Sequence, residues 1–237
     1  MVCGYFQIGS ERMNTTDAQR AQYLDAMGIP QWERRDLPKP QSAPHVNTES
    51  STADWQALEE AVRTCTRCSL YEGRTQTVFG VGNRNAEWMV IGEAPGAEED
   101  RQGEPFVGRA GQLLNAMLKA IGLAREQVYI ANILKSRPPN NRDPLPGEVA
   151  ACEPFLQRQI QLIQPKIILA VGRIAAQNLL KTDTKIGALR GKRFTCPSTD
   201  IPVVVTYHPA YLLRAPGEKR KAWEDLKFAC KVFRDEA

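Results

Sequence analysis

The sequence has no run of about 18 apolar residues, the length that a helix needs to cross a membrane. Its N-terminal segment also lacks an apolar core followed by a cleavage site, the pattern of a secretion signal. These absences predict a cytoplasmic protein with no membrane partner. No G-x-S-x-G motif and no G-x-x-x-x-G-K-S/T motif follows an expected strand, which argues against an acyl hydrolase or a P-loop nucleotide-binding protein.

Histidine is scarce, with only two in the chain. His45 lies in a segment rich in Pro, Ser, Asn and Thr, whereas His208 follows an apolar run and stands beside Pro, Tyr, Leu and Arg residues. A lone histidine is more often structural than catalytic, but this setting makes His208 a candidate. The six cysteines have no secretory context, so thiols or metal ligands are favoured over a disulfide framework.

Composition favours a folded protein, since 42% of the 237 residues are hydrophobic and 24% are charged. The formal net charge of +4 suits an anionic partner. Basic residues outnumber acidic ones from Arg190 to Arg234, which predicts a phosphate-facing surface, although a solvated helix face explains the same charges. Residues 1–51 are expected to form an N-terminal extension and linker, partly disordered, and residues 52–237 one domain.

Short apolar runs alternate with helical patterns in the second segment, giving four units of strand then helix. The expected strands are Trp88–Ile91, Val128–Leu134, Ile167–Val171 and Val203–Thr206, and the helical patterns after them are Ala110–Ile121, Val149–Ile163, Ala175–Leu180 and Ala222–Val232. These units predict a three-layer α/β/α fold with a central, four-stranded, mostly parallel sheet. Ligands of such folds bind outside the carboxyl ends of the strands, so chemistry is expected directly after each strand.

Two motifs fit that rule. Residues 92–96 read G-E-A-P-G after the first strand and are trailed by E-E-D at 98–100 and P-F-V-G at 105–108. Residues 208–213 read H-P-A-Y-L-L after the last strand. Glycine lets backbone approach a ligand closely and proline stiffens a turn, but a tight turn before an acidic helix start explains the first motif as well.

Together with Asn132 in A-N-I, these motifs make the chain resemble the family 4, iron–sulfur type of uracil-DNA glycosylases, over about Cys65 to Val232. The resemblance implies that residues 52–237 form a DNA repair glycosylase domain. Such an enzyme flips uracil out of DNA, hydrolyses the N-glycosidic bond, releases free uracil and leaves an abasic site. The expected partners are single- and double-stranded DNA containing uracil, and a monomer is the default.

The resemblance also implies a pocket for the flipped base. In this pocket Phe106 stacks on the base, and the Asn132 amide reads the pyrimidine edge through its donor and its acceptor. His208 donates a hydrogen bond to uracil O2 as negative charge develops there. The implied substrate-binding residues are Gly92, Ala94, Gly96, Phe106 and Asn132.

The resemblance identifies the residue that activates water less directly. Family 1 enzymes place an aspartate in the first motif, and Ala94 stands at the matching position here. We therefore expect a nearby carboxylate to act, Glu99 first and Glu93 second.

The last motif is expected to contact DNA. Tyr211, Leu212, Leu213 and Arg214 resemble a wedge and phosphate clamp, in which an apolar side chain fills the gap left by the flipped nucleotide. Lys219 adds a further cation. The alternative is that the two leucines are simply buried at a helix start.

Three cysteines fit the cofactor that the resemblance implies, a 4Fe–4S cluster. Cys65 and Cys68 form a close pair and Cys152 lies far along the chain. The family places its later two cysteines with fifteen residues between them, and that spacing before Cys152 leads to Ser136. Four readings are open: Ser136 ligates through oxygen, the cluster has three irons, an outside ligand completes it, or the residue was substituted and the cluster is labile. A zinc site also remains open.

The alternative function is a non-catalytic DNA-binding module with an iron–sulfur or zinc site. Such a module needs the basic C-terminal stretch but has no use for the set of Phe106, Asn132 and His208. Release of uracil from DNA separates the two hypotheses.

Overall fold

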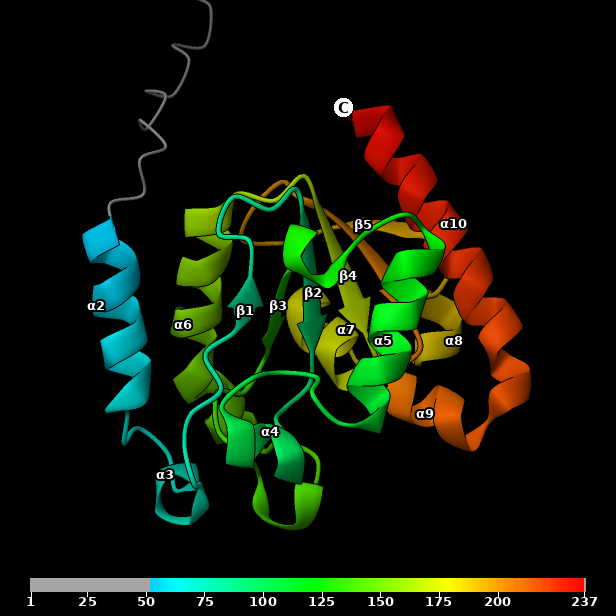
Figure 1. Ribbon diagram of the computed structural model, residues 1–237. Helices are drawn as coiled ribbons and strands as arrows, with labels where there is room; N and C mark the ends of the chain where they lie inside the picture. Colours follow the sequence, from blue (N-terminus) through cyan, green and yellow to red (C-terminus); the bar gives the residue numbers. More distant parts are fainter. Residues whose placement is uncertain (1–51, 237) are drawn as a thin grey trace, which may run out of the picture. The chain divides into compact units, whose positions relative to one another are not determined.

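The computed structural model describes residues 52–236 (Figure 1). The extension and linker expected over residues 1–51 lie outside them. One sheet has the strand order β1-β3-β2-β4-β6-β5. Its strands are β1 (Val81–Gly82), β2 (Trp88–Gly92), β3 (Tyr129–Asn132), β4 (Ile167–Val171), β5 (Arg193–Thr195) and β6 (Pro202–Thr206).

The four central strands are parallel, as the sequence predicted. Each of them is buried along its whole length because helices cover both faces of the sheet, and this is why each reads as a continuous apolar run. The sheet has six strands rather than four, since β1 and β5 pair antiparallel at its two edges. They span only two and three residues and are partly exposed, so the sequence pattern does not show them.

The helices include the four predicted ones and several short ones at the rim of the sheet. They are α2 (Thr52–Arg63), α3 (Leu70–Gly73), α4 (Ala97–Gln102), α5 (Arg109–Ala120), α6 (Pro146–Ile163), α7 (Arg173–Leu180), α8 (Ile186–Leu189), α9 (Pro209–Arg214) and α10 (Lys219–Glu236), with 3-10 turns η1 (Arg125–Gln127), η2 (Pro139–Asn141) and η3 (Pro216–Glu218). Within residues 52–236 no helix combines the length and apolar character needed to cross a membrane.

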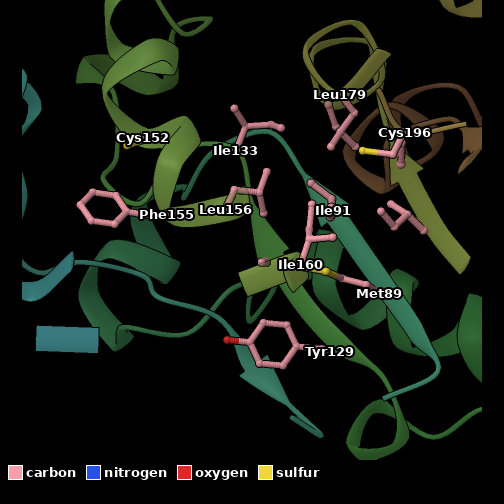
Figure 2. Close-up of a cluster of buried hydrophobic side chains, with 14 of the residues drawn as sticks. Met89, Ile91, Tyr129, Ile133, Cys152, Phe155, Leu156, Ile160, Leu179 and Cys196 are labelled. Carbon is pink, nitrogen blue, oxygen red and sulfur yellow. The ribbon is translucent and has the colours of Figure 1, made fainter. Parts of the chain in front are cut away.

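Alternate residues of β2 face two separate hydrophobic clusters. Met89 and Ile91 pack against Leu156 and Ile160 of α6, as Figure 2 shows. Trp88 and Val90 belong to the other cluster, with side chains of α5, α9 and α10. The sheet is thus the middle of three layers, which confirms the expected fold class. The loop to α4 and helix α9 lie at the same edge of the sheet (Figure 1).

Candidate active site

A cavity of about 420 Å³ opens at the carboxyl ends of β2, β3 and β6. This is the position where parallel α/β sheets bind ligands. It brings together the two motifs and the strand end that the sequence singled out. Its lining includes Glu93, Ala94, Gly96, Glu99, Phe106, Asn132, His208, Tyr211 and Arg214.

Gly92 lets Asn132 and Phe106 approach each other beneath this cavity. Gly92 pairs with Asn132 across β2 and β3. A Cβ at residue 92 would lie 2.5 Å from Asn132 Oδ1 and 2.6 Å from Phe106 Cζ, distances that real side chains do not reach. Asn132 Oδ1 is buried and has no hydrogen-bond partner among residues 52–236. An unsatisfied buried acceptor that lines a cavity marks a position for a ligand's donor.

The Phe106 ring is held in an unusual backbone conformation, with φ at 55°. Few side chains adopt this left-handed region, and such positions cluster at functional sites. The Arg125 guanidinium stabilises the turn by donating to the carbonyl oxygens of Pro105 at 2.6 Å and Phe106 at 3.4 Å. The ring centroid lies 5.6 Å from that of His208, and the two planes differ by 29°. An aromatic wall therefore lies beside the imidazole.

His208 is poised as a neutral hydrogen-bond donor. Its Nδ1 accepts from the Ala210 backbone N–H at 3.1 Å, so the proton of the neutral ring is on Nε2. Burial lowers the pKa of His208 to about 4, the Arg214 guanidinium adds to the decrease, and Glu99 opposes it. The ring is consequently uncharged at pH 7, with Nε2–H as its remaining donor.

Glu99 is fully occupied by the backbone. Its Oε1 accepts from the N–H groups of Val107 at 3.1 Å and Gly108 at 3.2 Å, and its Oε2 accepts from Gly96 at 3.1 Å. The carboxylate thereby ties the G-E-A-P-G turn to the P-F-V-G turn. This arrangement positions the wall of the cavity.

Glu93 has the opposite surroundings. It lines the cavity, and within the described part of the chain no hydrogen bond holds its side chain. Burial raises the pKa of the Glu93 carboxyl to about 7; the Asp143 carboxylate adds to the rise, and the Arg173 guanidinium opposes it. A carboxylate with a pKa near neutrality suits proton transfer at pH 7.

Helix α9 differs from the expected wedge in one residue. Leu212 is only 1% exposed and packs in the cluster with α5 and α10, so it anchors the helix and is not available to enter DNA. Tyr211, by contrast, is 38% exposed, and Arg214 and Lys219 are exposed as well. Leu213 is partly exposed and is the remaining apolar candidate.

The three cysteines of the expected cluster site come together. Cys65 and Cys68, between α2 and α3, pack against the hydrophobic cluster that contains Cys152 of α6. Burial raises the pKa of the Cys152 thiol, the Lys135 backbone N–H opposes the rise, and Cys68 and Cys65 add to it. Three neighbouring thiols fit part of the ligand set of an iron–sulfur cluster. Among residues 52–236 no group of three or more His, Cys, Asp or Glu side chains is arranged to hold a single metal ion.

The fourth position does not fit a thiolate cluster. Ser136 is buried, and its Oγ accepts from the Arg74 guanidinium at 3.1 Å. Arg74 also donates to the backbone oxygen of Arg63 at the end of α2. Cys196 is buried in the same hydrophobic cluster as Cys152, and Cys230 is partly buried against the other cluster.

Sequence reasoning missed a buried lysine next to this position. Lys135 is 2% exposed and donates to the Asn132 backbone oxygen at 2.9 Å. Burial lowers the pKa of Lys135 to about 7, while Cys152 opposes the decrease. The one available signal is a charged residue directly after the apolar pair Ile133 and Leu134. Pattern alone does not separate it from a lysine at a solvent-exposed strand end.

Comparison with known proteins identifies the family. The family model of the uracil DNA glycosylase superfamily matches residues 79–227. The type-4 uracil-DNA glycosylase of Archaeoglobus fulgidus is 45% identical over 181 residues, which cover 73% of this chain and 91% of the relative. The corresponding enzymes of Sulfurisphaera tokodaii and Thermotoga maritima are 44% and 41% identical, over 73% and 76% of this chain and 81% and 95% of theirs. The chain therefore belongs to the uracil DNA glycosylase superfamily and, within it, to the type-4 uracil-DNA glycosylases.

Proposed function

We propose that the cavity receives a uracil flipped out of DNA and that the enzyme hydrolyses its N-glycosidic bond, releasing uracil and leaving an abasic site. The observation that carries this proposal is the buried, unpartnered Asn132 Oδ1 in one cavity with Phe106 and His208. An extrahelical pyrimidine supplies a partner for each of the three side chains: a donor for the Asn132 oxygen, a ring for the Phe106 face and an oxygen for the His208 donor. The relatives named above are uracil-DNA glycosylases by name.

Recognition follows from the Asn132 amide. Its Oδ1 accepts from uracil N3–H and its Nδ2 donates to uracil O4. Cytosine presents an acceptor at N3 and an amine in place of O4, so both bonds are lost and buried groups remain unpaired. Gly92, Ala94 and Gly96 contribute small residues, and the Phe106 face stacks on the base.

Bond cleavage uses the neutral His208. As the bond between C1′ and N1 breaks, its electron pair leaves with the base and negative charge grows on uracil O2. The Nε2–H of His208 donates to that oxygen and stabilises the uracil anion without giving up its proton. Loss of such a donor costs about 2.7–4 kcal/mol.

We assign the water to Glu93 in preference to Glu99. The oxygen of a water molecule bonds to C1′ as the base departs, and the Glu93 carboxylate takes its proton. Glu93 lines the cavity and has no competing hydrogen bond within the described residues, whereas three backbone N–H groups occupy Glu99. The order expected from sequence is therefore reversed, and Glu99 becomes a positioning residue.

DNA lies along α9 and the start of α10 in this proposal. Tyr211 and Leu213 support the gap left by the flipped nucleotide, and Arg214 and Lys219 hold phosphates. Leu212 keeps the helix on the core. Because the contacts are to one nucleotide and its backbone, we propose action on single- and double-stranded DNA by a monomer.

Cys65, Cys68 and Cys152 would hold an iron–sulfur cluster. When bound, the cluster supplies a structural tie and takes no part in hydrolysis. It joins the segment between α2 and α3 to α6, and Ser136 with Arg74 stands where a fourth thiolate is absent.

Uracil release is the direct test. The purified protein is incubated with single- and double-stranded oligonucleotides that carry one uracil, and with matched strands that carry thymine or cytosine at that position. Free uracil and alkali-sensitive abasic sites are expected from the uracil strands only. Binding of uracil-containing DNA without release of base would overturn the proposal and favour the non-catalytic DNA-binding module.

A further inference from the structure

Lys135 is a buried amine, and among residues 52–236 the acceptors of its Nζ are three neutral oxygens. Its Nζ donates to the Asn132 backbone oxygen at 2.9 Å, to Gln159 Oε1 at 2.7 Å and to the Phe79 backbone oxygen at 3.3 Å. Burying an amine is costly unless its donors are satisfied, and here three acceptors meet them. In the part of the chain that the structure describes, this buried amine is held by hydrogen bonds and by no carboxylate. Its position therefore points to a role in the site.

The Lys135 amine bonds to the backbone of Asn132, the residue proposed to read the base. Lys135 follows Asn132 by three positions, so this bond closes the turn after β3. The intervening residues are fixed as well, because the N–H groups of Ile133 and Leu134 donate to the Gly92 and Glu93 carbonyls at 3.0 and 3.1 Å. The Asn132 backbone is thereby held while its Oδ1 remains unpartnered at the cavity.

The other contacts of Lys135 lie in rigid parts of the fold. Gln159 of α6 also donates through Nε2 to the Phe79 carbonyl at 2.9 Å and to the Tyr129 hydroxyl at 3.2 Å. Gln159 is completely buried. This network reaches the Asn132 backbone through the Lys135 ammonium, so Lys135 transmits the rigidity of α6 to the base-reading residue.

We propose that Lys135 is a positioning residue for uracil recognition, which holds the Asn132 backbone so that the Asn132 amide meets the pyrimidine edge. This inference rests on the proposed role of Asn132. Positioning matters because a site that is loose by a fraction of an ångström loses much of its rate. The role predicts a loss of catalytic rate without a loss of DNA affinity.

The test compares Lys135→Met with Tyr129→Phe. Methionine has a similar length but no donor, whereas Tyr129→Phe removes a contact of Gln159 and leaves every contact of Lys135 intact. Lys135→Met is expected to lower the single-turnover rate of uracil excision about 10- to 100-fold, with the Kd for DNA changed less than about twofold. Tyr129→Phe is expected to stay within about threefold of the unaltered rate. Thermal unfolding of both variants records stability.

A double variant shows whether Lys135 acts through Asn132. Adding Lys135→Met to Asn132→Ala is expected to cause no further loss of rate, because the group to be positioned is already gone. Full rate in Lys135→Met, or losses that multiply in the double variant, would overturn the inference. Full rate in Asn132→Ala would instead remove the proposed role of Asn132. If Lys135→Met does not fold, Lys135→Gln, whose shorter amide does not reach all three oxygens, takes its place with the same outcomes.

Discussion

Two glutamates six positions apart show how surroundings decide the role of a residue. Glu93 and Glu99 both line the cavity and both follow β2. Three backbone N–H groups hold the Glu99 carboxyl in a structural role, while burial raises the pKa of Glu93, whose side chain has no hydrogen bond within the described residues. Sequence patterns report only that two carboxylates are near one motif. Assigning them requires hydrogen bonds, which depend on the fold.

The pH profile tests the assignment of Glu93. Its carboxylate is the active form, and with a pKa of about 7 the ionised fraction rises with pH up to that value. We expect kcat/KM to rise about tenfold per pH unit below pH 7 and to level off above it. His208, with a pKa of about 4, is already neutral there and does not cause this limb.

The matching variant is Glu93→Gln, which is expected to lower kcat/KM at pH 8 about 100-fold and to abolish the limb near pH 7. Rates are measured by uracil release between pH 5 and 9. A limb that persists in Glu93→Gln would assign it to another group.

Asn132→Ala is expected to lower uracil excision by about 100-fold or more, since the amide supplies both bonds to the pyrimidine edge. Fold and affinity for DNA are expected to be unchanged. Asn178→Ala is the control, because the one hydrogen bond of the Asn178 amide among the described residues is to the Ile174 backbone oxygen, within α7. Uracil release and a DNA titration on the same samples give both quantities. Full excision by Asn132→Ala would remove Asn132 from the site.

At the scale of elements, the parts of the fold that follow from local pattern were predictable. The central strands β2, β3, β4 and β6 are buried and mostly apolar, and the motifs lie at or directly after the carboxyl ends of β2, β3 and β6. The short edge strands were not predictable, because a few residues carry no period, and the helix starts at α4 and α9 were expected from sequence only as alternatives. Leu212 shows the same limit within the site, since H-P-A-Y-L-L does not indicate which leucine faces the core.

Helix α9 and the start of α10 are the elements expected to bind phosphates. Arg214→Ala or Lys219→Ala is expected to weaken binding to all DNA sequences and to lower the slope of log Kd against log salt by about one. Lys166→Ala is the control, because Lys166 pairs with Glu87 just before β4, at the amino end of the sheet. Salt titrations with uracil-free DNA measure the slope. An unchanged slope in both variants would place the DNA surface elsewhere.

At the scale of the whole molecule, the cysteine site ties together segments far apart in the chain. With Cys65, Cys68 and Cys152 as thiolates and only Ser136 beside Arg74 at the fourth position, one iron is expected to be labile. Ser136→Cys is expected to raise iron content and resistance to oxidation, because a thiolate binds iron more strongly than a serine hydroxyl. Activity per folded molecule is expected to change little.

Iron and acid-labile sulfide per chain, together with the visible spectrum, are measured for both proteins purified without oxygen. Cys230→Ser is the control for general thiol effects. Four stable irons per chain in the unaltered protein would defeat the labile-site prediction. Absence of iron from both proteins would refute the cluster itself.

The strand order also determines when activity arises as the chain is made. Asn132 ends β3 and His208 follows β6, and these strands are not neighbours, since β2 and β4 lie between them. A chain that ends before β6 would contain the amide proposed to read the base but not the imidazole proposed to stabilise the departing uracil. In the proposed mechanism the site is complete only when β6 has paired with β4 and brought His208 to the cavity. A chain that ends before His208 is therefore expected to release no uracil.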